Sequence, residues 1–135
     1  MKLLRTFKSL LTEVASLSDL QDSIRKKIVM TIYYDGDNPG GKGIRRIEPV
    51  CLGYSKAGNM VLRAWDLDGA SHTATTGEQP LPGWRLFRVD KIFTYQPTTD
   101  TFSVERPGYN PNGDRSMDSV IINADFTDNT ETQYA

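Results

Sequence analysis

Residues 28–34, with the sequence IVMTIYY, decide the fold class of this chain. The run consists almost wholly of β-branched and aromatic residues, which favour the pleated surface of a strand. Turn chemistry follows at residues 35–41, DGDNPGG, and a second strand pattern follows at residues 44–54. Two strand patterns joined by a glycine-rich turn predict a β-hairpin. Pro49 interrupts the second strand, which predicts an edge position or a bulge there, because proline donates no ladder hydrogen bond.

The rest of the chain continues in short strand patterns separated by turn residues. Further strands are predicted at residues 60–65, 84–89 and 91–95, with an edge strand at residues 120–122. Turns are predicted at residues 56–59 and 66–69, and a loop at residues 70–83. Short strands at this spacing predict a mainly β fold, a small barrel or meander.

Two helices are predicted before the first strand. In residues 2–16 an apolar stripe of Leu3, Phe7, Leu10, Leu11 and Val14 recurs at helical spacing. A second helix begins near Ser18, where Ser18 and Gln21 form a capping box, and ends near Lys27. The stripe cannot be buried by the helix alone, and we expect it to pack against the chain's own barrel or against a dimer partner. A membrane surface is the weaker alternative, because the helix lacks a rich lysine face and a large aromatic anchor.

Length and charge describe one small domain with an acidic end. The chain has 135 residues, a net charge of −1 and a single cysteine. Residues 1–34 carry six Lys or Arg against three Asp or Glu, whereas residues 98–135 carry two against seven. No apolar run approaches the ~20 residues that span a bilayer, and residues 1–5 do not begin a signal peptide. We therefore expect a cytoplasmic protein with no membrane partner.

Four blocks of the sequence resemble the WYL domain family. They are residues 32–34 (IYY), 45–49 (RRIEP), 58–66 (GNMVLRAWD) and 85–92 (RLFRVDKI), in the order and spacing of that family. The family's naming triplet falls on residues 60–62, which are Met-Val-Leu here, and the tyrosine that usually follows Glu-Pro is Val50. The chain is thus similar to a stand-alone, phage- or bacterial-type member that diverges at the triplet.

The resemblance implies a fold and a division of the chain. The implied fold is a small Sm-like (src-homology-3-like) β-barrel of about five strands with one or two N-terminal helices. Residues 1–23 form an N-terminal helical arm, residues 24–97 the barrel, and residues 98–135 an irregular acidic extension. WYL domains are regarded as ligand sensors in transcription regulation, with single-stranded nucleic acid or nucleotides as the ligands proposed for them.

A set of cationic and aromatic residues in these blocks is the predicted ligand-binding site. Guanidinium groups bind phosphate bidentately, and aromatic rings stack on bases at roughly 1–3 kcal/mol each. The predicted residues are Arg45, Arg46, Arg63, Arg85, Arg88, Lys91, Tyr33 and Trp65, with Tyr34 and Trp84 also available for stacking. The alternative is a solvated strand face with ordinary ion pairs to Glu48, Asp66 and Asp90.

The sequence offers no convincing catalytic or metal site. Residues 36–42 fit Gly-x4-Gly-Lys, but Gly43 replaces the hydroxyl residue of a P-loop, so a hairpin turn is expected. His72 lies in a loop without placed partners, and Cys51 lies in a strand as a small core residue. Asp35, Asp37, Asp66 and Asp68 are expected to form turns. We therefore expect no enzyme, no cofactor and no metal.

Two functions follow from these patterns. The leading prediction is a non-enzymatic regulatory module that binds single-stranded nucleic acid or a nucleotide through a basic barrel face. The alternative is a protein-interaction or structural module that docks on a host or viral partner through the barrel and N-terminal helix. Homodimer formation is left open by the sequence.

Overall fold

Six β-strands dominate the structure, which is a computed structural model and describes residues 17–36, 42–69 and 81–127. The strands are β1 (Ile28–Asp35), β2 (Lys42–Ser55), β3 (Met60–Gly69), β4 (Gly83–Arg88), β5 (Ile92–Thr101) and β6 (Met117–Asn123). A helix covers residues 17–26, and a short 3₁₀ helix, η1 (Val89–Lys91), joins β4 to β5. The predicted mainly β fold is confirmed. The apolar stripe of residues 2–16 and the residue His72 lie outside the described residues.

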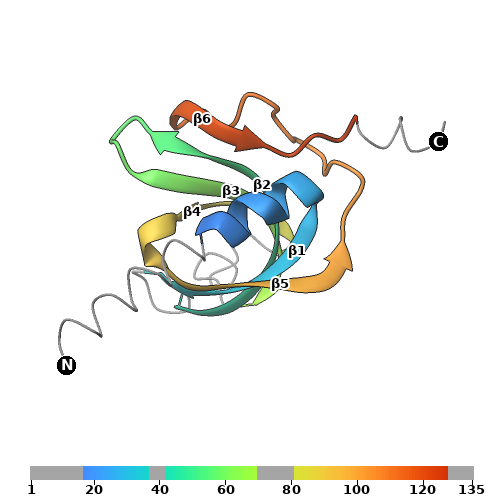
Figure 1. The fold of residues 1–135 in the computed structure, drawn as a ribbon. Coiled ribbons are helices and arrows are strands. Elements are labelled where there is room, and N and C mark those ends of the chain that lie inside the picture. The colour runs from blue at the N-terminus through green and yellow to red at the C-terminus, as the bar shows by residue number, and fades with distance from the viewer. Residues whose placement is uncertain (1–16, 37–41, 70–80, 128–135) are drawn as a thin grey trace.

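All pairings in the sheet are antiparallel, in the order β4-β3-β2-β1-β5, with β6 added to β2. Figure 1 shows the sheet curving strongly around its inner face. β4 and β5 stand at the two ends of this path, and no pairing between them closes it among the described strands. The prediction of a turn at residues 66–69 is wrong, since β3 continues through Gly69.

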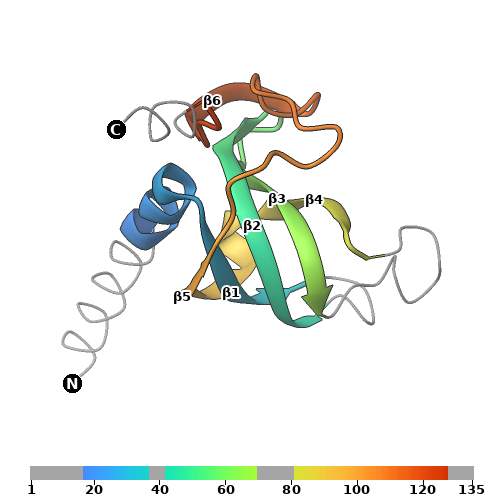
Figure 2. The same cartoon turned by 90° about the vertical axis from the view of Figure 1, so that its right-hand side faces the viewer.

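β2 is the longest strand, and it changes partner midway. Its first half pairs with β1 up to Ile47, and its second half pairs with β6 from Cys51 onward. Pro49 lies between the two pairings, and the register with β3 shifts between Pro49 and Cys51. Because proline has no N–H to donate, β2 does not need a hydrogen-bond acceptor from a neighbouring strand at this residue. A gap in the pairing along one edge is therefore tolerated here. The predicted bulge at Pro49 is confirmed. Figure 2 shows β2 running from the lower strands up to β6.

The core fills the inner face of the curved sheet. It gathers buried side chains from every strand of the main path and from the helix, among them Leu20, Ile24, Ile32, Ile47, Leu62, Phe87 and Ile92. Cys51 is completely buried, as predicted for a small core residue. Burial, with a smaller effect from the charge of Asp114, raises the pKa of the Cys51 thiol to about 11. The thiol therefore stays protonated and poorly nucleophilic at neutral pH.

The chain beyond residue 97 belongs to the same packed unit. β5 runs on to Thr101, and the segment that follows packs Phe102 and Ala124 into the core. The backbone N–H of Phe102 donates to the carbonyl of Lys27, at 2.9 Å, and ties the segment to the end of the helix. No helix in the described part of the chain is long and apolar enough to cross a membrane.

The close approach of β6 to β2 depends on Gly53. A β-carbon on Gly53 would lie 2.2 Å from the carbonyl oxygen of Ser119 in β6. We predict that Gly53→Ala forces β6 away from β2 and lowers the free energy of unfolding by roughly 1–3 kcal/mol. Urea unfolding measures the loss. Ser119→Ala, which keeps the carbonyl and changes an exposed side chain, should stay within about 0.5 kcal/mol. Equal stability of Gly53→Ala and the parent chain would contradict this packing.

Candidate functional site

A segment of irregular chain crosses the outer face of the sheet between β5 and β6. We call residues 102–116 the strap. Arg106 donates from Nε and Nη2 to the two carboxylate oxygens of Glu48, at 2.9 and 2.7 Å. This bidentate pair fastens the strap to β2, and the hydrogen bond that Arg106 donates to Glu48 raises the pKa of the Arg106 guanidinium. Figure 2 shows the strap, in orange, passing across β2.

Further contacts fasten the strap to β4 and to the end of β6. The indole Nε1 of Trp84 donates to the carbonyl of Pro107 at 2.7 Å. The hydroxyl of Tyr109 donates to the carbonyl of Ala124 at 2.8 Å. Burial, then the charges of Cys51, Glu105 and Asp125, raises the pKa of Tyr109 to about 12, so this hydroxyl remains a donor. Gly108 and Gly113, at φ of 84° and 99°, supply the left-handed turns that the path requires.

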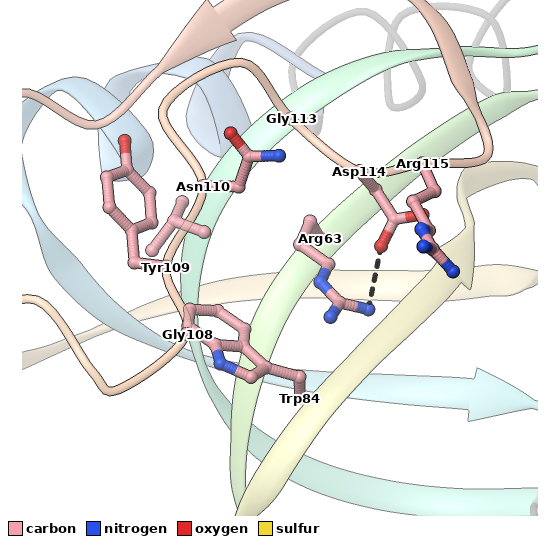
Figure 3. A pocket seen from close by; sticks show the side chains of 9 residues that line it. Arg63, Trp84, Gly108, Tyr109, Asn110, Gly113, Asp114 and Arg115 are labelled. Carbon is pink, nitrogen blue, oxygen red and sulfur yellow. Dashed lines mark ion pairs between the residues drawn. The ribbon is translucent and has the colours of Figure 1, made fainter.

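A pocket of about 210 Å³ lies between the strap and the outer face of β3 and β4. Figure 3 shows the rings of Trp84 and Tyr109 toward one side of it and the side chains of Asp114 and Arg115 toward the other, with Arg63 between. Val50, Asn110 and the two strap glycines complete the lining. The volume is below the roughly 300–1,000 Å³ of pockets that enclose drug-sized ligands. It suits one ring or one phosphate group with the remainder of the ligand outside.

Arg63 is the central charge of this pocket. Its guanidinium lies over the Trp84 ring, 5.3 Å from the centroid, and its Nη1 is 3.0 Å from the Asp114 carboxylate. Desolvation raises the pKa of Asp114, but hydrogen bonds from Ser116 and the charges of Arg63 and Arg115 outweigh it and keep the pKa below its usual value. Two guanidinium groups therefore face one ionised carboxylate, and the pocket has a net positive charge.

Only Arg63 among the eight predicted residues lines the pocket. Trp65 lies next to it, directly opposite Trp84 in the β3–β4 register, with the two rings edge to face at 5.2 Å. Arg106 of the strap covers the Trp65 ring at 5.6 Å from its centroid. Trp65 is not among the residues that line the pocket, and its ring supports the pocket wall from behind Trp84.

Arg45 and Arg85 lie on the inner face, where they surround Asp66. Arg45 is buried and its Nη1 contacts the Asp66 carboxylate at 3.0 Å, while its guanidinium lies 5.2 Å from the centroids of Tyr34 and Phe87. Burial lowers the pKa of Arg85, as do the charges of Arg45 and Arg63, while the charge of Asp66 raises it. Asp66 is completely buried, so the turn role predicted for it is wrong: it is an internal counter-ion.

The remaining predicted residues lie elsewhere on the surface. Arg46 is exposed and its Nη2 pairs with Asp68 at 3.1 Å. Arg88 pairs with Asp90 at 2.7 Å, and Lys91 ends the 3₁₀ helix η1. Tyr33 stacks on Phe93. The predicted cations therefore divide among the inner face, the pocket and the outer rim, and do not converge on one surface.

The sequence analysis missed the strap side of the site. Tyr109, Asn110, Asp114 and Arg115 fall in the extension predicted to be irregular, and their contacts to β3 and β4 reach across many residues of chain. One sequence feature could have indicated the strap: a tyrosine lies among turn residues in the segment PGYNPNGD, residues 107–114. An aromatic ring in such a segment is expected to pack against another part of the protein. In residues 17–36, 42–69 and 81–127, no three His, Cys, Asp or Glu side chains form a group that could hold a metal ion.

Comparisons of the chain with family models, with curated proteins and with solved structures find no match. The pocket and its chemistry are therefore the grounds on which a function can be argued.

The buried Asp66 carboxylate predicts an unusual pH dependence of stability. Burial raises its pKa from 3.8 to about 6, against the charge and hydrogen bond of Arg45 and the charge of Arg85. The folded chain therefore binds this proton more tightly than the unfolded chain does. As pH falls from about 6 to about 4, Asp66 should increase the free energy of unfolding, on the order of 1–3 kcal/mol, and this contribution is lost as pH rises.

The measurement compares urea unfolding of the parent chain and Asp66→Asn at pH 7.5 and at pH 4.5. The stability difference between parent and variant should grow in favour of the parent at the lower pH, because asparagine cannot take up the proton. Asp68→Asn, a change at the neighbouring exposed carboxylate, serves as the matched control. A difference that shrinks toward pH 4.5 would mean that Arg45 and Arg85 hold the carboxylate ionised. If Asp66→Asn does not fold, the slope of the parent chain alone, against that of Asp68→Asn, carries the test.

Proposed function

We propose that this chain is a non-enzymatic, ligand-sensing module of the WYL type that binds a nucleotide or the end of a single-stranded nucleic acid in the strap pocket. The observation that carries the proposal is the Arg63 guanidinium, which lies over the Trp84 ring and lines the same pocket as Arg115. A ring to stack on and two guanidinium groups for phosphate are the two parts that such a ligand needs.

The fold supports the same proposal. The WYL-like blocks fall on β1, β2, β3 and the β4–η1–β5 segment, so the resemblance follows the sheet strand by strand. The three-residue η1 links β4 and β5, the two ends of the strand path, over a short stretch of chain. A cytoplasmic role in regulation, in a phage or a bacterium, goes with this assignment. The alternative is docking on a host or viral partner through the barrel and the N-terminal helix, and the helix predicted for residues 2–16 lies outside the described residues.

The pocket size sets what part of the ligand enters. A cavity of about 210 Å³ holds one base or one phosphate, not a whole nucleotide in extended form. Stacking on Trp84 and Tyr109 tolerates any base, because every base has a π-face, whereas Asn110 offers a donor and an acceptor to a base edge. Since the overall charge is −1, long-range attraction is weak and affinity depends on these local contacts.

The first test is a fluorescence titration of the full chain with mononucleotides and with short single-stranded DNA and RNA. We expect saturable binding at low salt, weakened by moderate salt. Arg63→Ala should weaken it by about tenfold or more, and Trp84→Leu by about fivefold or more. Arg46→Ala is the matched control, because Arg46 is also an outer-face arginine paired with an aspartate, but lies outside the pocket. Absence of binding at low salt, or equal losses in Arg63→Ala and Arg46→Ala, would refute the proposal.

Asp114 gives a second test with the opposite sign. Its carboxylate is paired with the Arg63 guanidinium, which is the group that a ligand phosphate would bind. The two anions therefore compete for one guanidinium. Asp114→Asn keeps the acceptor for the Ser116 N–H, which donates to Oδ1 at 2.8 Å, and removes the charge. We predict that affinity for a phosphorylated ligand rises about threefold to fivefold, the effect of removing one weak ion-pair competitor. The same titration with an unphosphorylated nucleoside should show no gain. A loss of phosphate affinity in this variant would contradict the competition.

A further inference from the structure

The strap leaves part of the outer face of the sheet uncovered, across β5, β1 and β2. We call Tyr33, Ile44 and Phe93 the open face. Ile44 is 62% exposed and Phe93 60%, among the most exposed large apolar side chains of the described chain. The Tyr33 and Phe93 rings stack at 5.8 Å with an angle of 15°, and Tyr33 is directly opposite Ile44 in the β1–β2 register. The three side chains therefore form one apolar ridge across three neighbouring strands.

The geometry of the strands does not require apolar residues here. Side chains alternate between the two faces of a strand, so the buried Met30 and Ile32 leave Tyr33 on the outer face, and the buried Arg45 and Ile47 leave Ile44 there. Phe93 falls at the register shift between β1 and β5, where Tyr33 pairs with Thr94 and Tyr34 with Ile92. The outward face of an antiparallel sheet is ordinarily polar, and a contiguous apolar patch on it indicates a contact surface.

Charges of both signs lie beside the ridge on the described part of β1, β2 and β3. On β2, Lys42 and Arg46 flank Ile44 on either side; Lys42 lies 3.7 Å from Asp35 and Arg46 lies 3.1 Å from Asp68. These four side chains are between 42% and 60% exposed. A polyanion such as nucleic acid would meet two carboxylates here for two cations, and an anionic membrane surface would meet the same obstacle. A surface with balanced charges around an apolar centre fits a copy of itself.

We propose that the open face, with its rim of Lys42, Asp35, Arg46 and Asp68, is the contact between two copies of this chain in a two-fold symmetric dimer. In such an isologous contact each residue is used twice, so the small ridge becomes a six-residue apolar centre. Cations of one copy can then face carboxylates of the other. The contact is small, and such interfaces are weak and concentration-dependent.

The proposed dimer contact and the ligand pocket have no residue in common. Arg63 and Trp84 belong to β3 and β4, on the other side of β2 from β1 and β5, and the ridge side chains belong to β1, β2 and β5. The dimer therefore does not depend on the proposed ligand.

The test is sedimentation equilibrium of the full chain over about 5–500 µM. The expected mass rises with concentration from the 15.1 kDa monomer toward twice that value. Ile44→Thr with Phe93→Thr removes the ridge with a residue that still favours strands, and should raise the dimer dissociation constant at least about tenfold. Thermal unfolding of the double variant checks that the fold is retained, and the single variant Phe93→Thr replaces it if it is not.

Ile121→Thr is the matched control, because Ile121 is an exposed apolar residue on β6, 45% exposed and away from the open face. It should leave the dissociation constant unchanged. A chain that stays monomeric at the highest concentration overturns the proposal. So does a dimer that survives the double variant, or one that Ile121→Thr abolishes, since the contact would then lie elsewhere.

Discussion

The rest of the structure depends on β2 having no hydrogen-bond donor at Pro49. A strand in the middle of a sheet needs partners on both edges, and β2 has β3 along one edge for nearly its whole length. Along the other edge of β2, the pairing with β1 ends at Ile47 and the pairing with β6 begins at Cys51. In between, the carbonyl of Val50 accepts a hydrogen bond from Ala124 N–H at 2.7 Å, so the gap is closed from the chain that follows β6. The missing N–H therefore allows β1 and β6 to pair with successive parts of β2 along the same edge.

This exchange of partners also positions the site. Glu48, immediately before Pro49, takes the bidentate contact from Arg106, and Val50, immediately after it, lines the pocket. The strap therefore crosses the outer face at the part of β2 where the pairing with β1 has ended and the pairing with β6 has not begun.

The sequence predicted those features that local patterns determine. Most strands, the Pro49 bulge and the burial of Cys51 follow from composition and period within a few residues. The arrangement of charges did not follow, because period-two alternation sends Arg45 and Arg46 to opposite faces and only the tertiary structure decides which face is inner. The turn expected at Asp66 failed for the same reason: Asp66 resembles a turn aspartate until its neighbour across the sheet is known to be a buried arginine. The pocket could not be predicted, since Arg106 and Glu48 are 58 residues apart in the chain.

The inner and outer arginines therefore have different physical roles. On the inner face, Arg45 and Asp66 are a buried pair, and such pairs contribute little net stability compared with apolar replacements, although loss of one partner is severe. The pair favours one register of β2 against β3, because a shift of one strand by one residue would turn its charge to the outer face and leave the partner buried without a counter-ion. On the outer face, Arg63 is only partly buried, and the proposed function has it exchange its contacts with a ring and a carboxylate for contacts with a ligand. The same residue type is thus a buried counter-ion on one side of the sheet and a partly exposed pocket residue on the other, and burial separates the two.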